Sequence, residues 1–410
     1  MKSSVNKLWT KNFTIITLGT VISMFGSSVS NFAIGLLILD KTNSTFLYSL
    51  FFVFAMVPNM IVPLLAGPFI DRFSRRKMIY VLDFISFLIF AISALITYFN
   101  FFNYFVFLLV GVICGIVSSI YQVAYDSFYP MLISEGNFSK AYSIGSLLYP
   151  LANTIMVPIA AIAYEYVGLF PLFAFNALSY LIASLAETQI KIKEEQVIHK
   201  ESEDFNFKKE LKDGFSYLKK EKGLWAVTKY FWITMFAGGI VQTLLLPFFK
   251  SSPSLNTTHY SLVMSSQTLG RIIGGLIHYK IVYPAAKKYK IAVFVYAVVS
   301  IFDVVFFFSP FKLMLLIYLL YGILAVTSFN IRTSSTQSYV PNEKRGRFNG
   351  MFAVITMMGS VLGQLLGGFF GEFIYIPYII VVSGILNLLG IYFFVIKNKE
   401  AIKLVYNRRV

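Results

Sequence analysis

Several ionisable side chains lie inside long apolar stretches of this sequence, where a charge is costly and usually faces a cavity or a partner. Asp83, Asp126 and Asp303 are the carboxylates in such stretches. A carboxylate enclosed by hydrocarbon can bind and release a proton. Each of the three is therefore a proton-coupling candidate, the alternative being a structural charge satisfied by a neighbour. Arg271 follows a run of polar residues that includes Gln267. It could line a cavity and hold an anionic group, or it could pair with a carboxylate.

The apolar stretches themselves indicate what must position these residues. Hydrophobic residues make up 57% of the 410 residues, charged residues only 13%, and the mean hydropathy is +0.71. A helix needs about 20 apolar residues to cross the hydrocarbon layer. Runs of this kind recur along the whole chain, and helix is the structure that satisfies their backbone amides in lipid. The sequence therefore predicts an all-α membrane protein with twelve transmembrane helices, at residues 13–39, 46–70, 78–98, 101–127, 139–164, 167–188, 224–249, 258–283, 290–309, 312–334, 347–372 and 374–396.

The positions of Lys and Arg predict the orientation of the spans. The net charge is +16, and the basic residues gather in alternate connections. The opposite connections hold Lys41, Lys250 and Lys312. Because positive loops stay in the cytosol, we expect a multi-pass protein of the plasma membrane with both termini cytoplasmic. This placement also argues against nucleic-acid binding, since the charge forms no continuous basic surface.

A polar segment at residues 189–223 divides the chain into two sets of six spans. We expect an N-terminal six-helix bundle at 1–188, a cytoplasmic linker with an amphipathic helix at 189–223, and a C-terminal bundle at 224–410. That helix could lie on anionic lipid or serve as a solvated connector. Similar landmarks end corresponding spans of the two halves: Gly67 to Arg72 matches Gly274 to Tyr279, and Ser127 to Pro130 matches Ser338 to Pro341. The halves are therefore predicted to be pseudo-repeats.

One connection carries a family motif. Residues 67–77 read Gly-Pro-Phe-Ile-Asp-Arg-Phe-Ser-Arg-Arg-Lys, which resembles the G-x-x-x-D-R-x-x-R-[RK] loop of the major facilitator superfamily. Within it, the chain looks most like bacterial macrolide-efflux-type drug exporters. Supporting segments lie at Gly19 to Ala33, at Leu211 to Leu218 and at Tyr339 to Gly350. One departure is residues 157–161, Val-Pro-Ile-Ala-Ala, where proton-exchanging exporters carry a glycine-rich stretch, so antiport is less secure.

The resemblance implies roles for further residues. Asp71, with Arg72, Arg75 and Arg76, would form a conformational latch at the cytoplasmic face, the alternative being a basic cluster that sets topology. Spans one, four, seven and ten line the substrate cavity in this family. Polar residues on these spans could contact substrate or form interhelical hydrogen bonds: Asn31, Gln122, Gln242 and Asn330.

Glycines at four-residue spacing mark span eleven. Gly359, Gly363, Gly367 and Gly371 fall on one helical stripe. Small residues at this spacing let two helix backbones approach closely in lipid, so we interpret the stripe as a packing surface.

These features predict a secondary transporter that works by alternating access on a small-molecule substrate. The best-supported function is proton-linked efflux of hydrophobic or amphipathic compounds. Alternatives are a facilitator or importer of an anionic metabolite that uses Arg271, and a transport-dead membrane sensor. The sequence has no phosphate-binding glycine loop followed by Lys and Ser or Thr, and its three histidines are scattered. We therefore expect no cofactor, no metal site and no enzymatic activity. We also expect the protein to be a monomer.

Overall fold

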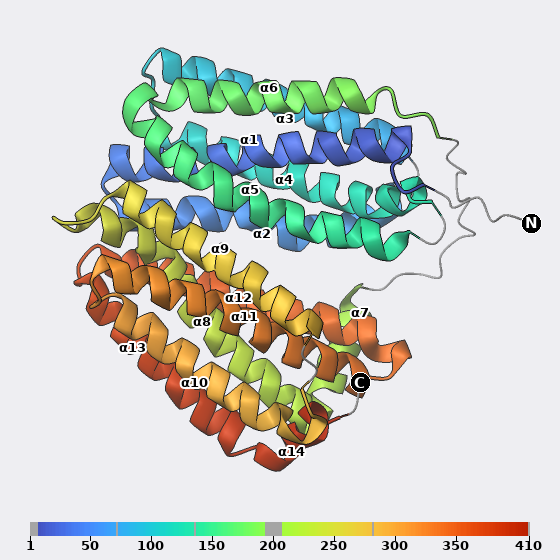
Figure 1. Ribbon diagram of the computed structural model, residues 1–410, viewed down its shortest axis with the longest axis vertical. Helices are drawn as coiled ribbons and strands as arrows, with labels where there is room; N and C mark the ends of the chain where they lie inside the picture. Colours follow the sequence, from blue (N-terminus) through green and yellow to red (C-terminus); the bar gives the residue numbers. More distant parts are fainter. Residues whose placement is uncertain (1–6, 71–72, 135–136, 193–206, 281–282, 409–410) are drawn as a thin grey trace, which may run out of the picture. The chain divides into compact units, whose positions relative to one another are not determined.

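The computed structural model describes residues 7–70, 73–134, 137–192, 207–280 and 283–408, and these residues are helical nearly throughout. The chain divides into two compact units (Figure 1). The first comprises Met1–Asn43 with Phe51–Lys200, and the second comprises Ser44–Leu50 with Glu201–Val410.

The helices of the first unit begin and end at the following residues: α1 (Lys11–Thr42), α2 (Thr45–Ile70, whose first turns belong to the second unit), α3 (Arg75–Tyr98), α4 (Tyr104–Phe128), a short 3-10 turn η1 (Tyr129–Leu132), α5 (Phe138–Val167) and α6 (Leu169–Glu187). Those of the second unit are α7 (Phe207–Lys220), α8 (Lys222–Ser251), α9 (Thr257–Lys280), a 3-10 turn η2 (Ala285–Lys287), α10 (Lys288–Phe306), α11 (Phe311–Tyr339), α12 (Asn342–Gly371), α13 (Ile376–Gly390), its π-helical continuation η3 (Ile391–Ile396) and α14 (Lys399–Tyr406).

The long helices have membrane-spanning character. In the described part of the chain, ten helices are long and apolar enough to cross a bilayer. The remaining two long helices, α5 and α9, have 30 and 24 residues. Large apolar side chains point outward from the long helices, as at Leu276 of α9 and Phe294 of α10, which are 66% and 65% exposed. An outer surface of this kind suits lipid rather than water. The chain is therefore an all-helical, multi-pass membrane protein, as the sequence predicts.

The two units repeat one pattern of helix pairs. In the first, α1 packs on α5, and α6 packs on both α1 and α3. In the second, α8 packs on α12, and α13 packs on both α8 and α10. Two six-helix pseudo-repeats require these pairs. In the second unit α8 corresponds to α1, α12 to α5, α10 to α3 and α13 to α6. The tight contact of Gly115 with Ala55 joins α4 to α2, and the contact of Gly270 with Leu319 joins α9 to α11 in the same way.

Local signals fix the helix ends near the predicted positions. The side chain of Thr10 accepts a hydrogen bond from the Phe13 amide at the start of α1. Ser74 caps α3 in the same way. Asn43 ends α1 with φ of +49°, a left-handed conformation that asparagine tolerates. Capping groups of this type satisfy the amides that a helix leaves unpaired in its first turn.

The linker helix α7 packs against protein. Leu218 is fully buried, and a Cβ atom at Gly214 would lie 2.7 Å from Met351 Cγ of α12. The Tyr339 hydroxyl donates to Glu221, directly after α7, at 2.8 Å. The described part of α7 therefore belongs to the base of the second unit.

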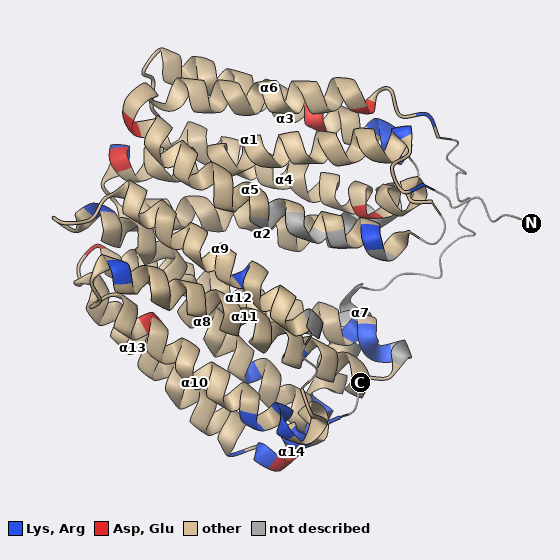
Figure 2. Cartoon of the chain, viewed as in Figure 1, with Lys and Arg blue, Asp and Glu red and all other residues tan. Residues whose placement is uncertain are grey.

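The charged residues of the second unit gather around that base. In Figure 2 the blue Lys and Arg residues cluster at one end of the unit, around α7 and α14. The C-terminal helix α14 packs there against α8, α10 and α11. Its buried residues are Ile402, Val405 and Tyr406. One end of the unit is thus basic and polar, while its long helices are apolar.

The first turn of α2 is held by an acidic residue at the end of α12. Glu372 Oε1 accepts a hydrogen bond from the Phe46 amide at 2.8 Å and one from the Ser44 hydroxyl. The Thr45 hydroxyl donates to the Gly368 carbonyl oxygen at 2.7 Å. A carboxylate at a helix N-terminus is favourable because it satisfies free amides and complements the helix dipole. These contacts account for the grouping of Ser44–Leu50 with the second unit.

Candidate functional site

The second unit contains a partly open cavity of about 470 Å³. Five of its helices, α8 to α12, contribute side chains to the wall. The lining residues are Tyr230, Phe231, Thr234, Met235, Arg271, Tyr296, Val299, Tyr321, Ala325, Val326, Ser328, Phe329, Arg332, Phe352 and Thr356. The size falls in the range of small-molecule sites, and the wall combines aromatic surface with a few polar groups, as such sites do.

Helical periodicity places these residues on the cavity wall. On α8, Tyr230 and Thr234 stand four residues apart, on one face of the helix. On α11, Ala325, Phe329 and Arg332 are four and three residues apart and also share one face of the helix. The Thr234 hydroxyl donates to Asn387 of α13 at 3.0 Å, and Asn387 donates to Ser300 of α10 at 2.9 Å. This buried network fixes α8, α10 and α13 relative to one another behind the cavity.

Two guanidinium groups are the charged groups in the cavity wall. Arg332 lies over three aromatic rings, with its guanidinium carbon 4.7 Å from the centroid of Phe352, 5.2 Å from that of Phe231 and 5.4 Å from that of Phe329. Cation–π contacts hold a guanidinium in place and leave its charge uncancelled. Arg271 enters from α9, and the described lining contains no Asp or Glu. The cavity is therefore aromatic and positively charged.

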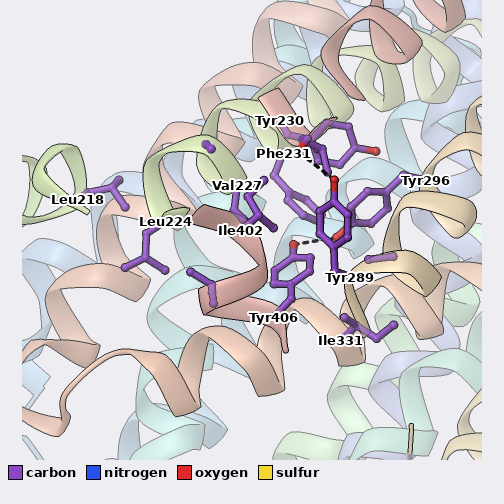
Figure 3. Packing of buried hydrophobic residues seen from close by; sticks show 14 of the residues in the cluster. Leu218, Leu224, Val227, Tyr230, Phe231, Tyr289, Tyr296, Ile331, Ile402 and Tyr406 are labelled. Atoms are coloured by element: carbon purple, nitrogen blue, oxygen red, sulfur yellow. Dashed lines mark hydrogen bonds between the residues drawn. The ribbon is translucent and has the colours of Figure 1, made fainter. Parts of the chain in front are cut away.

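The C-terminal helix packs behind one wall of the cavity. Figure 3 shows Tyr406 of α14 in one cluster with Tyr230 and Tyr296, which line the cavity. The rings of Tyr230 and Tyr296 lie 4.6 Å apart, and the hydroxyls of Tyr296 and Tyr406 lie 2.8 Å apart. The Ser335 hydroxyl donates to the Tyr406 carbonyl oxygen at 3.2 Å. Asn407 anchors the end of α14, since its side chain accepts from the Tyr289 amide at 3.0 Å. A helix that follows the last span thus contacts a residue of the cavity wall.

The three predicted proton-coupling candidates lie in different settings. Asp83 is 2% exposed inside the first unit, beside Glu187 of α6. Asp303 is 7% exposed in the second unit, near Tyr318 and Tyr321. Asp126 is exposed and accepts a hydrogen bond from Gln122 at 2.8 Å. Asp83 and Asp303 therefore have the enclosed environment that proton coupling needs, and Asp126 does not.

The structure brings Arg271 to the cavity but leaves the other predicted substrate contacts outside its wall. Asn31, Gln122 and Gln242 are exposed, and Gln267 and Asn330 are half-buried. None of these five lines the cavity of the second unit. The residues that do line it include Arg332 and six aromatic side chains, which sequence reasoning did not assign. The signal available for Arg332 was its position inside an apolar stretch.

The predicted latch lies partly outside the described residues, because Asp71 and Arg72 fall there. The Arg76 guanidinium donates to the Ile190 carbonyl oxygen at 2.7 Å, and Arg75 lies against the sulfur of Met131. These two arginines therefore tie the start of α3 to other segments of the first unit.

The glycine stripe of α12 faces α8 at backbone distance. A Cβ atom at Gly359 would lie 2.5 Å from the Trp232 carbonyl oxygen, and one at Gly367 would lie 3.0 Å from Ile240 Cα. Gly363 meets Phe236 and Gly371 meets Leu244 in the same register. The partners recur every four residues on α8, so a stripe of small residues on one helix receives a stripe of large residues on the other.

Two helical bundles of repeated design, buried ionisable groups and a cavity of small-molecule size define a membrane transporter. The sequence profile of the Major Facilitator Superfamily matches residues 16–352 and 258–406. The chain belongs to this superfamily.

Curated relatives place it near the macrolide-efflux branch. The chain is 23% identical over 275 residues to Macrolide efflux protein A of Streptococcus pyogenes, and the match covers 66% of this chain and 66% of that protein, just under two thirds. Macrolide efflux protein A of Enterococcus faecalis is 24% identical over 217 residues, with coverage of 52% and 65%. An uncharacterized MFS-type transporter of Bacillus subtilis, YkuC, is 23% identical over 288 residues, with coverage of 66% of each chain.

Solved structures share the fold. A bacterial homologue of the iron transporter ferroportin, in an inward-facing state, matches with a TM-score of 0.73 and 14% identity over 97% of this chain and 98% of that one. The nucleoside transporter NupG matches with a TM-score of 0.71 and 14% identity over 94% and 98%. At such identities the likeness concerns the fold alone.

Proposed function

We propose that this transporter exports hydrophobic or amphipathic small molecules by alternating access, in exchange for protons. The observation that carries the proposal is the aromatic cavity of about 470 Å³ in the second unit. Aromatic walls with a few polar groups accept amphipathic compounds of varied shape. The names of the curated relatives support efflux, and Asp83 and Asp303 are the enclosed carboxylates available for protons. The protein would act as a monomer with both termini in the cytosol and without a cofactor.

Everted membrane vesicles test both parts of this proposal. Vesicles that contain the protein should accumulate fluorescent amphipathic compounds when the interior is acidified, and vesicles without it should not. Collapse of the proton gradient should abolish the accumulation. Accumulation that survives the collapse would remove the proton-exchange part. Saturable binding of the same compounds to purified protein without any transport would indicate a transport-dead sensor.

The family motif at residues 67–77 supports a latch role for Asp71 with Arg72, Arg75 and Arg76. An acid at this loop would pair with basic groups in one conformation and release them in another. Asp71→Asn removes the charge and keeps the shape, so transport should slow while substrate binding persists. An unchanged transport rate in this variant would contradict the latch.

A second candidate function is transport of an organic anion. The two arginines of the cavity wall favour it, because no described Asp or Glu in that wall neutralises them. Guanidinium groups recognise carboxylates and phosphates through charge-assisted hydrogen bonds. Arg271→Ala should then weaken transport of an anionic compound and leave its neutral ester unaffected. Equal losses for both compounds would argue against this function.

A further inference from the structure

Two carboxyl groups from different helices meet in the interior of the first unit. Asp83 lies in the third turn of α3, and Glu187 is the last residue of α6. Asp83 is 2% exposed and Glu187 is 0% exposed. Their carboxyl groups lie within hydrogen-bonding reach of each other. The close packing of α3 on α6 causes this meeting, and the Ser184 hydroxyl reinforces it by donating to the Tyr80 carbonyl oxygen at 2.7 Å.

The chemistry of the pair requires at least one proton. A hydrogen bond between two carboxyl groups needs a donor, and only a protonated carboxyl group supplies one. Two ionised carboxylates side by side in an apolar interior would also repel strongly. Apart from the other carboxyl group of the pair, no hydrogen-bond donor among the described residues reaches Asp83 Oδ2 or either carboxyl oxygen of Glu187. After one proton binds, the pair still carries one negative charge, and that carboxylate can bind a second proton.

Further polar groups stand near the pair. Thr20 of α1 is 3% exposed, and its hydroxyl lies within hydrogen-bonding reach of the hydroxyls of Tyr121 and Tyr125 of α4. The Tyr121 hydroxyl is buried and feels the charges of both carboxyl groups. Neutral polar groups and apolar surface therefore enclose the pair, and in such surroundings a bound proton removes the cost of a buried charge.

The backbone of α1 is shaped to admit Glu187. A Cβ atom at Gly19 would lie 3.1 Å from Glu187 Oε1, so a glycine at this position lets the carboxyl group approach the helix. The titratable groups that face the pair are Tyr121 and Tyr125 from α4 and Tyr180 from α6. The residues of α1 that face it, Gly19 and Thr20, do not titrate.

We infer that Asp83 and Glu187 form a proton-binding site that alternates between one shared proton and two. This inference rests on the proposed proton-linked export, for which it names the site. On loading, a carboxylate oxygen accepts a proton from hydronium, an O–H bond forms and water leaves. On release, that proton returns to water and the remaining proton is again shared. Glu187 ends α6 and the Arg76 guanidinium binds the carbonyl oxygen of nearby Ile190, so the pair stands near the predicted cytoplasmic end of the unit.

Labelling with a hydrophobic carbodiimide tests the site directly in purified protein. The reagent adds to a protonated carboxyl group in apolar surroundings and ends as a stable N-acylurea, which mass spectrometry locates. We expect the label on Asp83 or Glu187 in the wild type, and its yield should fall as the pH rises. In Glu187→Gln and Asp83→Asn the remaining carboxyl group keeps its apolar surroundings but no longer shares a proton with a second carboxyl group, so its label should depend on pH differently from that of the wild type.

Controls separate this outcome from a change in fold. Glu165→Gln removes an exposed carboxyl group of α5 and should leave the labelling of the pair unchanged. Infrared difference spectra should show a protonated-carboxyl carbonyl band in the wild type and in Glu165→Gln, and that band should be lost in the double variant Asp83→Asn with Glu187→Gln. Labelling absent from both residues, or insensitive to pH, would overturn the inference. Protection by sodium ions at constant pH would also overturn it, in favour of a metal cation.

Transport assays then separate the inference from the proposed function. If the pair couples protons, both single variants should lose gradient-driven export and retain exchange of labelled substrate at equal concentrations. Retention of wild-type proton-driven export in both variants would contradict the coupling role. Failure of the proposed function has a different signature, because wild-type transport would then ignore the proton gradient while the labelling of the pair still followed pH.

Discussion

The hydroxyl groups of Tyr296 and Tyr406 lie 2.8 Å apart, so the last helix of the chain is bonded to the wall of the cavity. The ring of Tyr296 packs against that of Tyr230, which also lines the cavity, and all three tyrosines are buried. A C-terminal helix outside the spans is therefore part of the support of the candidate substrate site.

Tyr406→Phe should destabilise the second unit. The change removes one hydroxyl and leaves that of Tyr296 without its partner, which costs about 1 to 3 kcal/mol in a buried setting. Thermal unfolding in detergent should show a lower midpoint, and affinity for an amphipathic ligand should fall with it. Tyr378→Phe is the control, because Tyr378 is 63% exposed. Equal midpoints for the two variants would contradict the proposed support.

Gly363→Ala should loosen the contact of α12 with α8. The added methyl group would collide with the carbonyl oxygen of Phe236, which belongs to the backbone and cannot move aside cheaply. Overpacking of this kind costs about 1 to 3 kcal/mol. Gly238→Ala is a matched control on α8, since no atom lies within 4 Å of the added carbon. A comparison of unfolding midpoints decides the matter, and a Gly363→Ala variant as stable as Gly238→Ala would refute the close contact.

The positions of the membrane-spanning helices could be predicted from the sequence because each one depends on a local run of residues. About 20 apolar residues identify it without knowledge of its neighbours. The glycine stripe of α12 was also readable, since the four residues share one helical face before any partner is known. In the linker the pattern indicates an amphipathic helix, but a pattern alone cannot distinguish lipid from a protein surface as the partner of Leu218.

The site could be predicted only in part, because its residues converge through tertiary packing. Arg271 and Arg332 are on different helices, and neither helix indicates where the other will lie. Glu187 stands at the end of a span, next to a basic linker, where a carboxylate ordinarily faces water. Its burial depends on Gly19 of α1 and on the contact of α6 with α3. The role of Glu372 could not be predicted for the same reason, because its hydrogen-bond partners lie in the first turn of α2.

Leu218→Ala tests whether α7 is packed on protein. Leu218 is fully buried in the base of the second unit, so its truncation should cost about 2 to 5 kcal/mol through lost burial and a cavity. The matched control is Leu404→Ala on α14, where the side chain is 68% exposed and the cost should be about 0.5 kcal/mol or less. Chemical unfolding followed by tryptophan fluorescence measures both. A negligible effect of Leu218→Ala would mean that α7 detaches from the unit in solution.

Arg332→Gln should change the charge preference of the cavity. The guanidinium of Arg332 is fixed over Phe352, Phe231 and Phe329, so it presents its charge to a ligand at a defined position. Loss of this charge should weaken binding of an aromatic carboxylate by about tenfold, equal to about 1.4 kcal/mol, and should leave binding of its methyl ester nearly unchanged. Titration calorimetry on the purified protein measures both ligands.

The control for this measurement is Arg347→Gln, which removes an exposed arginine of α12 outside the cavity wall. Its affinity for the carboxylate should match that of the wild type. If Arg332→Gln and Arg347→Gln weaken the carboxylate equally, the effect comes from the overall charge of the protein and not from the cavity. If Arg332→Gln instead strengthens binding of a cationic analogue while the carboxylate is unaffected, the cavity selects cations and Arg332 opposes them. The comparison of three ligands that differ only in charge therefore determines which class of compound the aromatic wall accepts.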